Sequence, residues 1–167
     1  AGYRHGDPRS ALAQIDALIQ VQPNNPYFYE LRGQALLEGG RPQEAIAPLR
    51  KAMQLSHNAP LIQMLLGQAL VATNNPAYAE EAITSLRNAL SREPEAPMGF
   101  TQLSMAYARK GDLAQADLAS AQSSWLRGDF KTARDLASRA KTRFPIGSPG
   151  WVKADDIVST KQPGSTP

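Results

Sequence analysis

The sequence predicts an all-α protein in which antiparallel helix pairs stack into a solenoid, and two observations predict it. The first is a repeat, because a turn residue followed shortly by Ala recurs at spacings of 34, 37 and 34 residues, around Ala11, Ala45, Ala82 and Ala116. The second is that Gly and Pro separate stretches whose apolar residues recur at helical spacing. A period of this length is typical of stacked helix pairs.

The first complete unit spans residues 26–57 and is predicted to contain two helices. Apolar residues at helical spacing begin at Pro26 and stop at Gly39-Gly40, because glycine accepts the left-handed geometry that ends a helix. Pro42 suits the first turn of the second helix. Pro48 lies inside that second helix, where it removes one backbone hydrogen bond and should bend the helix locally.

The same pattern predicts two more complete units, at residues 60–94 and 97–127. The single spacing of 37 is one period plus three residues. These three residues fit in the polar loop at 73–76, because insertions in surface loops cost little. Before the first complete unit, residues 1–23 hold a cut helix pair, with the end of one helix and the whole of the next.

The end of the array departs from this period. Ala116 and Ala133 are 17 residues apart, which is half of 34. The helix at residues 113–126 is therefore predicted to serve twice, as the second helix of the third unit and the first helix of an overlapping half-unit at 114–145. Terminal repeats of a solenoid are commonly atypical in this way, because their outer faces meet water.

A capping helix at 148–159 is predicted to close the array. Short polar side chains that can accept backbone N–H bonds precede several of the predicted helices, at Asp7, Asp112, Asp129 and Ser148. Residues 1–160 are thus expected to form a single array. Residues 161–167 have nothing to pack against and are expected to be mobile.

The composition excludes most catalytic classes. The chain has no Cys, which removes disulfide scaffolds, thiol catalysis and Cys-ligated zinc. Its two His residues, His5 and His57, are predicted to be exposed turn residues rather than metal ligands. No HExxH, P-loop or GxSxG motif occurs. We therefore expect no catalytic, cofactor-binding or metal-binding residue in this chain, and no enzymatic activity of its own.

The charge pattern gives a weak signal. The net charge of +3 is too small to argue for nucleic acid or an anionic membrane, and no apolar stretch is long enough to span one. A basic cluster stands out within the last units, formed by Arg127, Lys131, Arg134, Arg139, Lys141 and Arg143. A solvated outer helix is the favoured interpretation of this basic cluster. An acidic partner, such as lipid headgroups or nucleic acid, is the alternative.

The repeated positions resemble the tetratricopeptide (TPR) repeat. Small residues stand at Gly33, Gly67 and Ser104, with Leu36, Leu70 and Tyr107 three residues later. Ala45, Ala82 and Ala116 follow, then Ala52 and Ala89, and closing prolines at Pro23, Pro94 and Pro145. His57 stands where a closing proline is expected, so that turn should be looser. The resemblance implies a right-handed superhelical TPR solenoid, with the small residues facing Ala45, Ala82 and Ala116.

The TPR resemblance also implies a concave groove, lined by the first helices of successive units, that holds a protein or peptide partner. The positions that would line it are Tyr27, Glu30, Gln34, Leu37, Leu61, Met64, Gln68, Met98, Thr101, Met105, Arg109 and Trp125. Met, Leu and aromatic side chains beside Gln and Glu suit an adaptable, partly apolar contact. TPR domains that clamp acidic chaperone peptides carry Lys, Arg and Asn on this face, so such a clamp is not expected.

Three segments resemble a narrower group, the C-terminal TPR region of bacterial BepA-like zinc metallopeptidases. They are residues 25–34 continuing into 40–46, residues 116–121, and residues 147–157. This resemblance implies a periplasmic protein in which an HExxH domain, holding the zinc, precedes and contacts the array and works in outer-membrane protein assembly. The array would recruit substrate or dock an assembly partner. A stand-alone TPR adaptor is the alternative, and an RNA-binding repeat is disfavoured.

Overall fold

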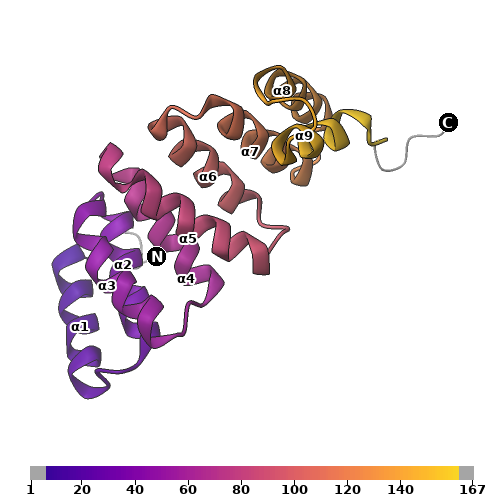
Figure 1. Cartoon of the computed structure of the whole chain (residues 1–167). Coiled ribbons are helices and arrows are strands. Elements are labelled where there is room, and N and C mark those ends of the chain that lie inside the picture. The colour runs from indigo at the N-terminus through magenta and orange to yellow at the C-terminus, as the bar shows by residue number, and fades with distance from the viewer. Residues whose placement is uncertain (1–6, 162–167) are drawn as a thin grey trace.

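The computed structural model describes residues 7–161, and Figure 1 shows them as a row of helices from one end of the molecule to the other. The elements in this part are α1 (Pro8–Val21), α2 (Pro26–Glu38), α3 (Pro42–Leu55), α4 (Pro60–Ala72), the short 3₁₀ helix η2 (Pro76–Tyr78), α5 (Ala79–Arg92), α6 (Pro97–Lys110), α7 (Leu113–Leu126), α8 (Phe130–Arg143) and α9 (Pro149–Ser159). Residues 7–161 contain no strand. Each α-helix packs on its neighbours in the chain, which confirms the all-α solenoid of antiparallel helix pairs.

Local sequence signals set most helix starts. The side chains of Asp7, Asp112, Asp129 and Ser148 accept backbone N–H bonds at the starts of α1, α7, α8 and α9, as predicted. Asn25 does the same for α2, a cap that the sequence reasoning missed. These bonds satisfy N–H groups that have no partner within the helix.

The two helices of a unit approach closely through glycine. A Cβ atom placed on Gly33 would lie 2.5 Å from Leu49 Cδ2, and one on Gly67 would lie 2.5 Å from Leu86 Cγ. The sequence predicts that these glycines face Ala45 and Ala82. In the structure they face Leu49 and Leu86 instead, which lie one helical turn later. The reason is that the fully buried leucine side chain fills the space that each glycine leaves.

The third unit uses a polar contact at the same place. Ser104 replaces the glycine, and Ser120 replaces the leucine. Their hydroxyl oxygens are 2.6 Å apart, and the Ser104 hydroxyl also donates to the Ala116 carbonyl at 2.8 Å. This helix pair is therefore joined by hydrogen bonds where the earlier pairs are joined by apolar packing.

Helix α7 contributes to two apolar cores. Its residues Ala116 and Ala119 belong to the core built on α2 to α6, whereas Leu118 and Ala121 belong to a second core shared with α8 and α9. Helix α7 packs against α6, α8 and α9. It therefore acts as a partner for helices on both sides of it.

The irregular segments keep the helices intact. Helix α3 runs through Pro48 without a break. The turn that lacks a closing proline places His57 and Asn58 at φ values of 54° and 63°, in the left-handed region. His57 is exposed, as predicted. His5 and most of the predicted tail, residues 162–167, lie outside the described residues. None of the helices in residues 7–161 combines the length and apolar character needed to cross a membrane.

Candidate functional site

The structure places most of the predicted groove residues at the surface. Five of them are exposed, namely Tyr27, Gln34, Leu61, Met98 and Met105. Six are half-buried, namely Glu30, Leu37, Gln68, Thr101, Arg109 and Trp125. Met64 alone among the twelve is buried.

Three of the exposed residues form a row. Tyr27, Leu61 and Met98 are the second residues of α2, α4 and α6, and their side chains are 57%, 68% and 54% exposed. Helix α4 packs against both α2 and α6, so these equivalent positions lie along one edge of adjacent helices. Met105, 42% exposed, lies two turns further along α6. We call Tyr27, Leu61, Met98 and Met105 the apolar ridge.

Met64 is a correction to the predicted groove. Its side chain is only 9% exposed, and its sulfur would lie 3.4 Å from a Cβ atom placed on Gly99 of α6. The residue therefore fills the space between α4 and α6 and offers little surface to a partner. Helical spacing places Met64 on the same side of α4 as other predicted groove residues, but it does not show how closely the next first helix covers that side.

Thr101 and Trp125 are engaged within the array. The Thr101 hydroxyl is 2.7 Å from the Ser123 hydroxyl and accepts a hydrogen bond from Arg127 at 3.3 Å. Trp125 lines a cavity of about 280 Å³ next to α9, and its ring packs edge-on against Phe130. Trp125 therefore faces a different part of the surface from the apolar ridge.

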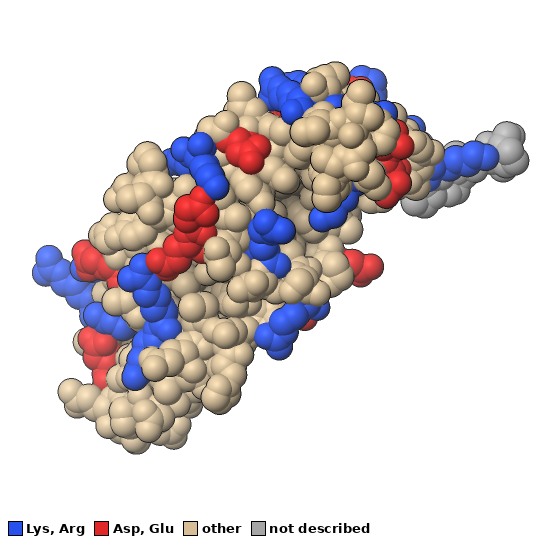
Figure 2. All heavy atoms as spheres, in the orientation of Figure 1, with Lys and Arg blue, Asp and Glu red and all other residues tan. Residues whose placement is uncertain are grey.

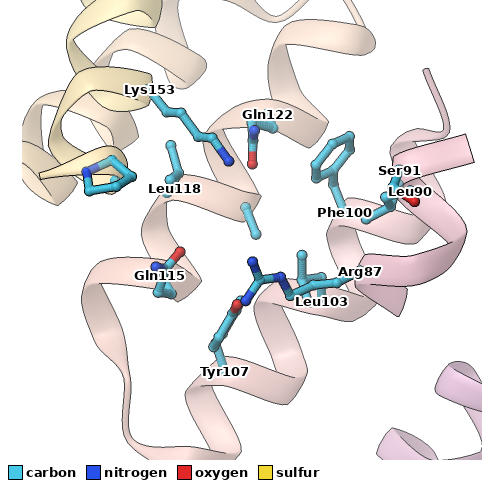
Figure 3. Close-up of a pocket in the computed structure, with 13 residues that line it drawn as sticks. Arg87, Leu90, Ser91, Phe100, Leu103, Tyr107, Gln115, Leu118, Gln122 and Lys153 are labelled. Carbon is cyan, nitrogen blue, oxygen red and sulfur yellow. The ribbon is translucent and has the colours of Figure 1, made fainter. Parts of the chain in front are cut away.

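Two further cavities lie where successive second helices meet the first helix between them. The first, of about 550 Å³, is lined by residues of α3, α4 and α5, and the Arg50–Glu81 ion pair stands at it. The second, of about 340 Å³, is lined by residues of α5, α6, α7 and α9 (Figure 3). We call them the α3–α5 cavity and the α5–α7 cavity. The sequence reasoning missed both, because it considered only the first helices as a binding surface.

The basic cluster is paired within the protein. Arg139 and Arg143 both donate to the buried Asp117 carboxylate, at 2.7 and 3.0 Å. Lys141 pairs with Asp155 at 2.7 Å and lies over the Trp151 ring. The remaining three also have partners, since Lys131 lies 3.7 Å from Asp135, Arg134 donates to the Thr160 carbonyl, and Arg127 donates to Thr101. Arg139, Arg143 and Lys141 therefore join α8 to α7 and α9, so these three are engaged in pairs between helices rather than only solvated as the favoured interpretation expects.

Three ion pairs raise the pKa of their basic partners, one in the basic cluster and two elsewhere. The hydrogen bond and charge of Asp117 raise the pKa of Arg139, and those of Glu81 raise the pKa of Arg50. Glu80 likewise raises the pKa of Lys110, with which it forms an ion pair. Figure 2 shows basic and acidic side chains interspersed over this face of the molecule. The surface in this view therefore presents no extended patch of one sign.

The described part of the chain contains no cluster of metal-binding side chains. Within residues 7–161, no three His, Asp or Glu side chains gather closely enough to hold a metal ion. The adjacent acids Glu80 and Glu81 pair with Lys110 and Arg50 on different helices. Their carboxylates therefore do not act together as an acid–base pair.

Comparisons with solved structures support the fold. The crystal structure of MamA matches with a TM-score of 0.70 and 18% identity, over 92% of this chain and 85% of that chain. MamA 41-end from Desulfovibrio magneticus RS-1 matches with a TM-score of 0.70 and 20% identity, over 92% and 83%. The thermophilic TPR protein TTC0263 of Thermus thermophilus matches with a TM-score of 0.55 and 19% identity, over 93% of both chains. No curated protein sequence matches this chain.

Family models identify the repeats directly. Two tetratricopeptide repeat models match the sequence, one over residues 2–60 and the other over residues 36–96. Together they span more than half of the chain. TPR repeats are typically non-catalytic modules that bind other proteins, and their fold needs no cofactor, which supports the expectation that this chain is not an enzyme. The chain belongs to the tetratricopeptide repeat family.

Proposed function

We propose that this chain is a protein–protein interaction module that holds a partner segment against the apolar ridge. The observation that carries the proposal is the row of large apolar side chains at equivalent positions of three adjacent helices, each more than half exposed. Grouped exposed apolar residues are typical of a protein contact surface, whereas singly scattered ones are common on any protein. Gln34 and Met105, which are also exposed, would add adaptable contacts.

The test uses the chain as bait, followed by mass spectrometry, and then binding measurements with the identified protein. Because Met64 is buried, Met64→Glu would disturb the core, so the informative variant is Leu61→Glu combined with Met98→Glu. We expect this variant to lose partner binding while its far-UV circular dichroism spectrum stays unchanged. Ile146→Glu is the matched control, because Ile146 is 89% exposed in the α8–α9 loop, away from the ridge. Full affinity in the double variant would contradict the proposal.

A narrower form of the proposal concerns the parent protein. The three segments that resemble BepA-like proteins support an array that serves a periplasmic HExxH zinc metallopeptidase, by recruiting substrate or docking an outer-membrane assembly partner. The stand-alone TPR adaptor remains the competing proposal. The gene sequence upstream of Ala1 separates them, because only the first requires an encoded HExxH motif and signal peptide there.

The proposed organisation into units follows the predicted ranges. We assign complete units to 26–57, 60–94 and 97–127, and an overlapping half-unit to 114–145. The division of α7 between two apolar cores supports this assignment. A chain that ends at residue 127 should then keep the apolar ridge and its partner binding, although it lacks α8 and α9.

A further inference from the structure

The α3–α5 and α5–α7 cavities occupy equivalent places in successive repeats. Residues of α3 and α4 correspond to residues of α5 and α6 at a separation of 37, and residues of α5 correspond to residues of α7 at a separation of 34. By this rule, Arg50 corresponds to Arg87, and Glu81 corresponds to Gln115. All four residues line their respective cavities. The repeat therefore provides an internal comparison of one site in two forms.

The two forms differ in charge. In the α3–α5 cavity, Arg50 donates to the Glu81 carboxylate at 2.5 and 3.0 Å, so the site neutralises its own cation. In the α5–α7 cavity, the residue equivalent to Glu81 is the uncharged Gln115. Arg87 forms no ion pair within residues 7–161. The same arginine position thus has its carboxylate in one repeat and lacks it in the next.

In the α5–α7 cavity three polar side chains of the first cavity are replaced by apolar ones, and a second cation is added. Gln63, Thr84 and Ser85 of the first cavity are replaced by Phe100, Leu118 and Ala119. Helix α9, which has no equivalent at the first cavity, supplies Lys153. Figure 3 shows the Arg87 side chain reaching into the cavity from α5 and the Lys153 side chain reaching in from α9. Lys153 also makes no ion pair in the described part of the chain.

The cavity continues into an apolar groove. The neighbouring cavity of about 280 Å³ shares Phe100, Gln122 and Lys153 with it and adds Trp125 and Ile157. Asp156 lies at this far end, without an ion pair in the residues described. Arg87 therefore lies in the α5–α7 cavity, Lys153 and Phe100 lie where the two cavities meet, and Trp125 and Ile157 lie with Asp156 at the far end of the combined groove.

We propose that this combined groove binds a peptide segment of a partner protein that carries an Asp or Glu next to a large apolar residue. The carboxylate replaces the missing Glu81 equivalent on Arg87 and contacts Lys153, and the apolar side chain packs on Phe100, Trp125 and Ile157. Charge complementarity selects this occupant, because Arg87 and Lys153 are exposed cations without an ion pair in the described residues, and an arginine forms charge-assisted hydrogen bonds to a carboxylate. The volume suits one or two side chains.

This site is separate from the apolar ridge. On α6, the cavity residues Phe100, Leu103 and Tyr107 lie on the opposite side of the helix from Met98 and Met105, as helical periodicity requires. The inference rests on the proposed function only in that both need a protein partner. The two surfaces can therefore be tested by different variants of the same chain.

The experiment selects short random peptides, displayed on phage, on the full chain and measures binding of the selected peptides by fluorescence polarisation. We expect the selected sequences to share an acidic residue beside a large apolar one. Arg87→Gln should weaken their binding about tenfold or more, which is typical of losing a charge-assisted hydrogen bond. Arg50→Gln is the matched control at the equivalent position of the preceding repeat, and it should bind normally.

Gln115→Glu is the decisive variant because it should not harm the fold. Residue 115 is the third residue of α7, where a Glu favours the helix start that Asp112 caps. The new carboxylate should pair with Arg87 as Glu81 pairs with Arg50. Arg87 is then no longer free to bind the carboxylate of a peptide. We expect peptide affinity to fall about tenfold or more while the unfolding midpoint in urea is unchanged or higher.

Four results would overturn the inference. If the selected peptides lack an acidic residue, the groove does not recognise a carboxylate. If they bind the Arg87→Gln variant, the Gln115→Glu variant and the wild type equally well, they do not bind in this groove. Loss of binding only in the Leu61→Glu, Met98→Glu variant would place the peptides on the apolar ridge, and the proposed function would then stand alone. Dimerisation that Arg87→Gln abolishes, with no peptide selected, would show that a second copy occupies the groove instead.

Discussion

The contact between Gly67 and Leu86 predicts that one substitution will have opposite effects in two backgrounds. A Cβ atom on Gly67 would lie 2.5 Å from Leu86 Cγ and 2.6 Å from Cδ2, much closer than packed carbon atoms can approach. Leu86 is fully buried, so it has no free space to move into. Gly67→Ala should therefore destabilise the protein, although alanine favours a helix more than glycine does.

The magnitudes follow from packing. Overpacking a core lowers the free energy of unfolding by about 1–3 kcal/mol, whereas the higher helix propensity of alanine raises it by about 1 kcal/mol. Gly67→Ala should therefore lower it by about 1 kcal/mol. Leu86→Ala creates a cavity and should cost about 2–5 kcal/mol. In that background the new methyl group meets no leucine, fills part of the cavity and keeps its helix propensity. The double variant should then be more stable than Leu86→Ala alone, by about 1 kcal/mol.

The assay is urea unfolding followed by far-UV circular dichroism on the wild type, both single variants and the double variant. The pair Gly33 and Leu49 in the preceding repeat has the same geometry and provides an independent repetition. The reasoning is wrong if Gly67→Ala stabilises the wild type, or if it destabilises the Leu86→Ala variant as much as it does the wild type. Either result would mean that the helices of a unit can move apart at little cost.

Two other predictions concern the last three helices, which contain both tryptophans, so that fluorescence during urea unfolding reports on them. Asp117→Asn should lower the urea midpoint less than the double variant Arg139→Gln, Arg143→Gln does. Asp117→Asn leaves two half-exposed arginines that can return to water, whereas the double variant leaves the Asp117 carboxylate, 10% exposed, without its partners. A larger loss for Asp117→Asn would contradict this. Gly150→Ala should destabilise the docking of α9 by about 1–3 kcal/mol, because a Cβ atom there would lie 2.5 Å from Phe144 Cζ. An unchanged tryptophan transition would contradict it.

The sequence predicted what local chemistry determines. The repeat, the helix starts at Pro26 and Pro42, and the caps at Asp112 and Asp129 all depend on residues close in the chain, and the structure has them where expected. The environment of Met64 depends on how closely α6 lies against α4, which residues far apart in sequence decide. Spacing within one helix carries no information about that distance.

The binding surfaces were harder to predict for the same reason. The sequence predicts Trp125 in the groove because α7 also serves as the first helix of the half-unit, and first helices line the groove. Helix α7 does divide its faces between two cores, but Trp125 turns toward α9 rather than toward the apolar ridge. The ion partners of the basic cluster were equally hidden, since Asp117 lies on α7 whereas Arg139 and Arg143 lie on α8.

A repeat protein allows packing and binding to be separated, because every unit must solve the same packing problem. Positions that keep their chemistry between two units, such as Gly33 with Leu49 and Gly67 with Leu86, are explained by packing alone. Positions that change without a packing reason need another explanation, and Gln115 in place of a Glu81 equivalent is such a change. Gln115 lies on α7, which packs against α9 and contributes to both apolar cores. The same helix lines the α5–α7 cavity, in which Arg87 has no carboxylate partner among the described residues. The change in packing at α7 thus supplies the α9 wall of the cavity, and the change of one side chain leaves the positive charge for a partner to neutralise.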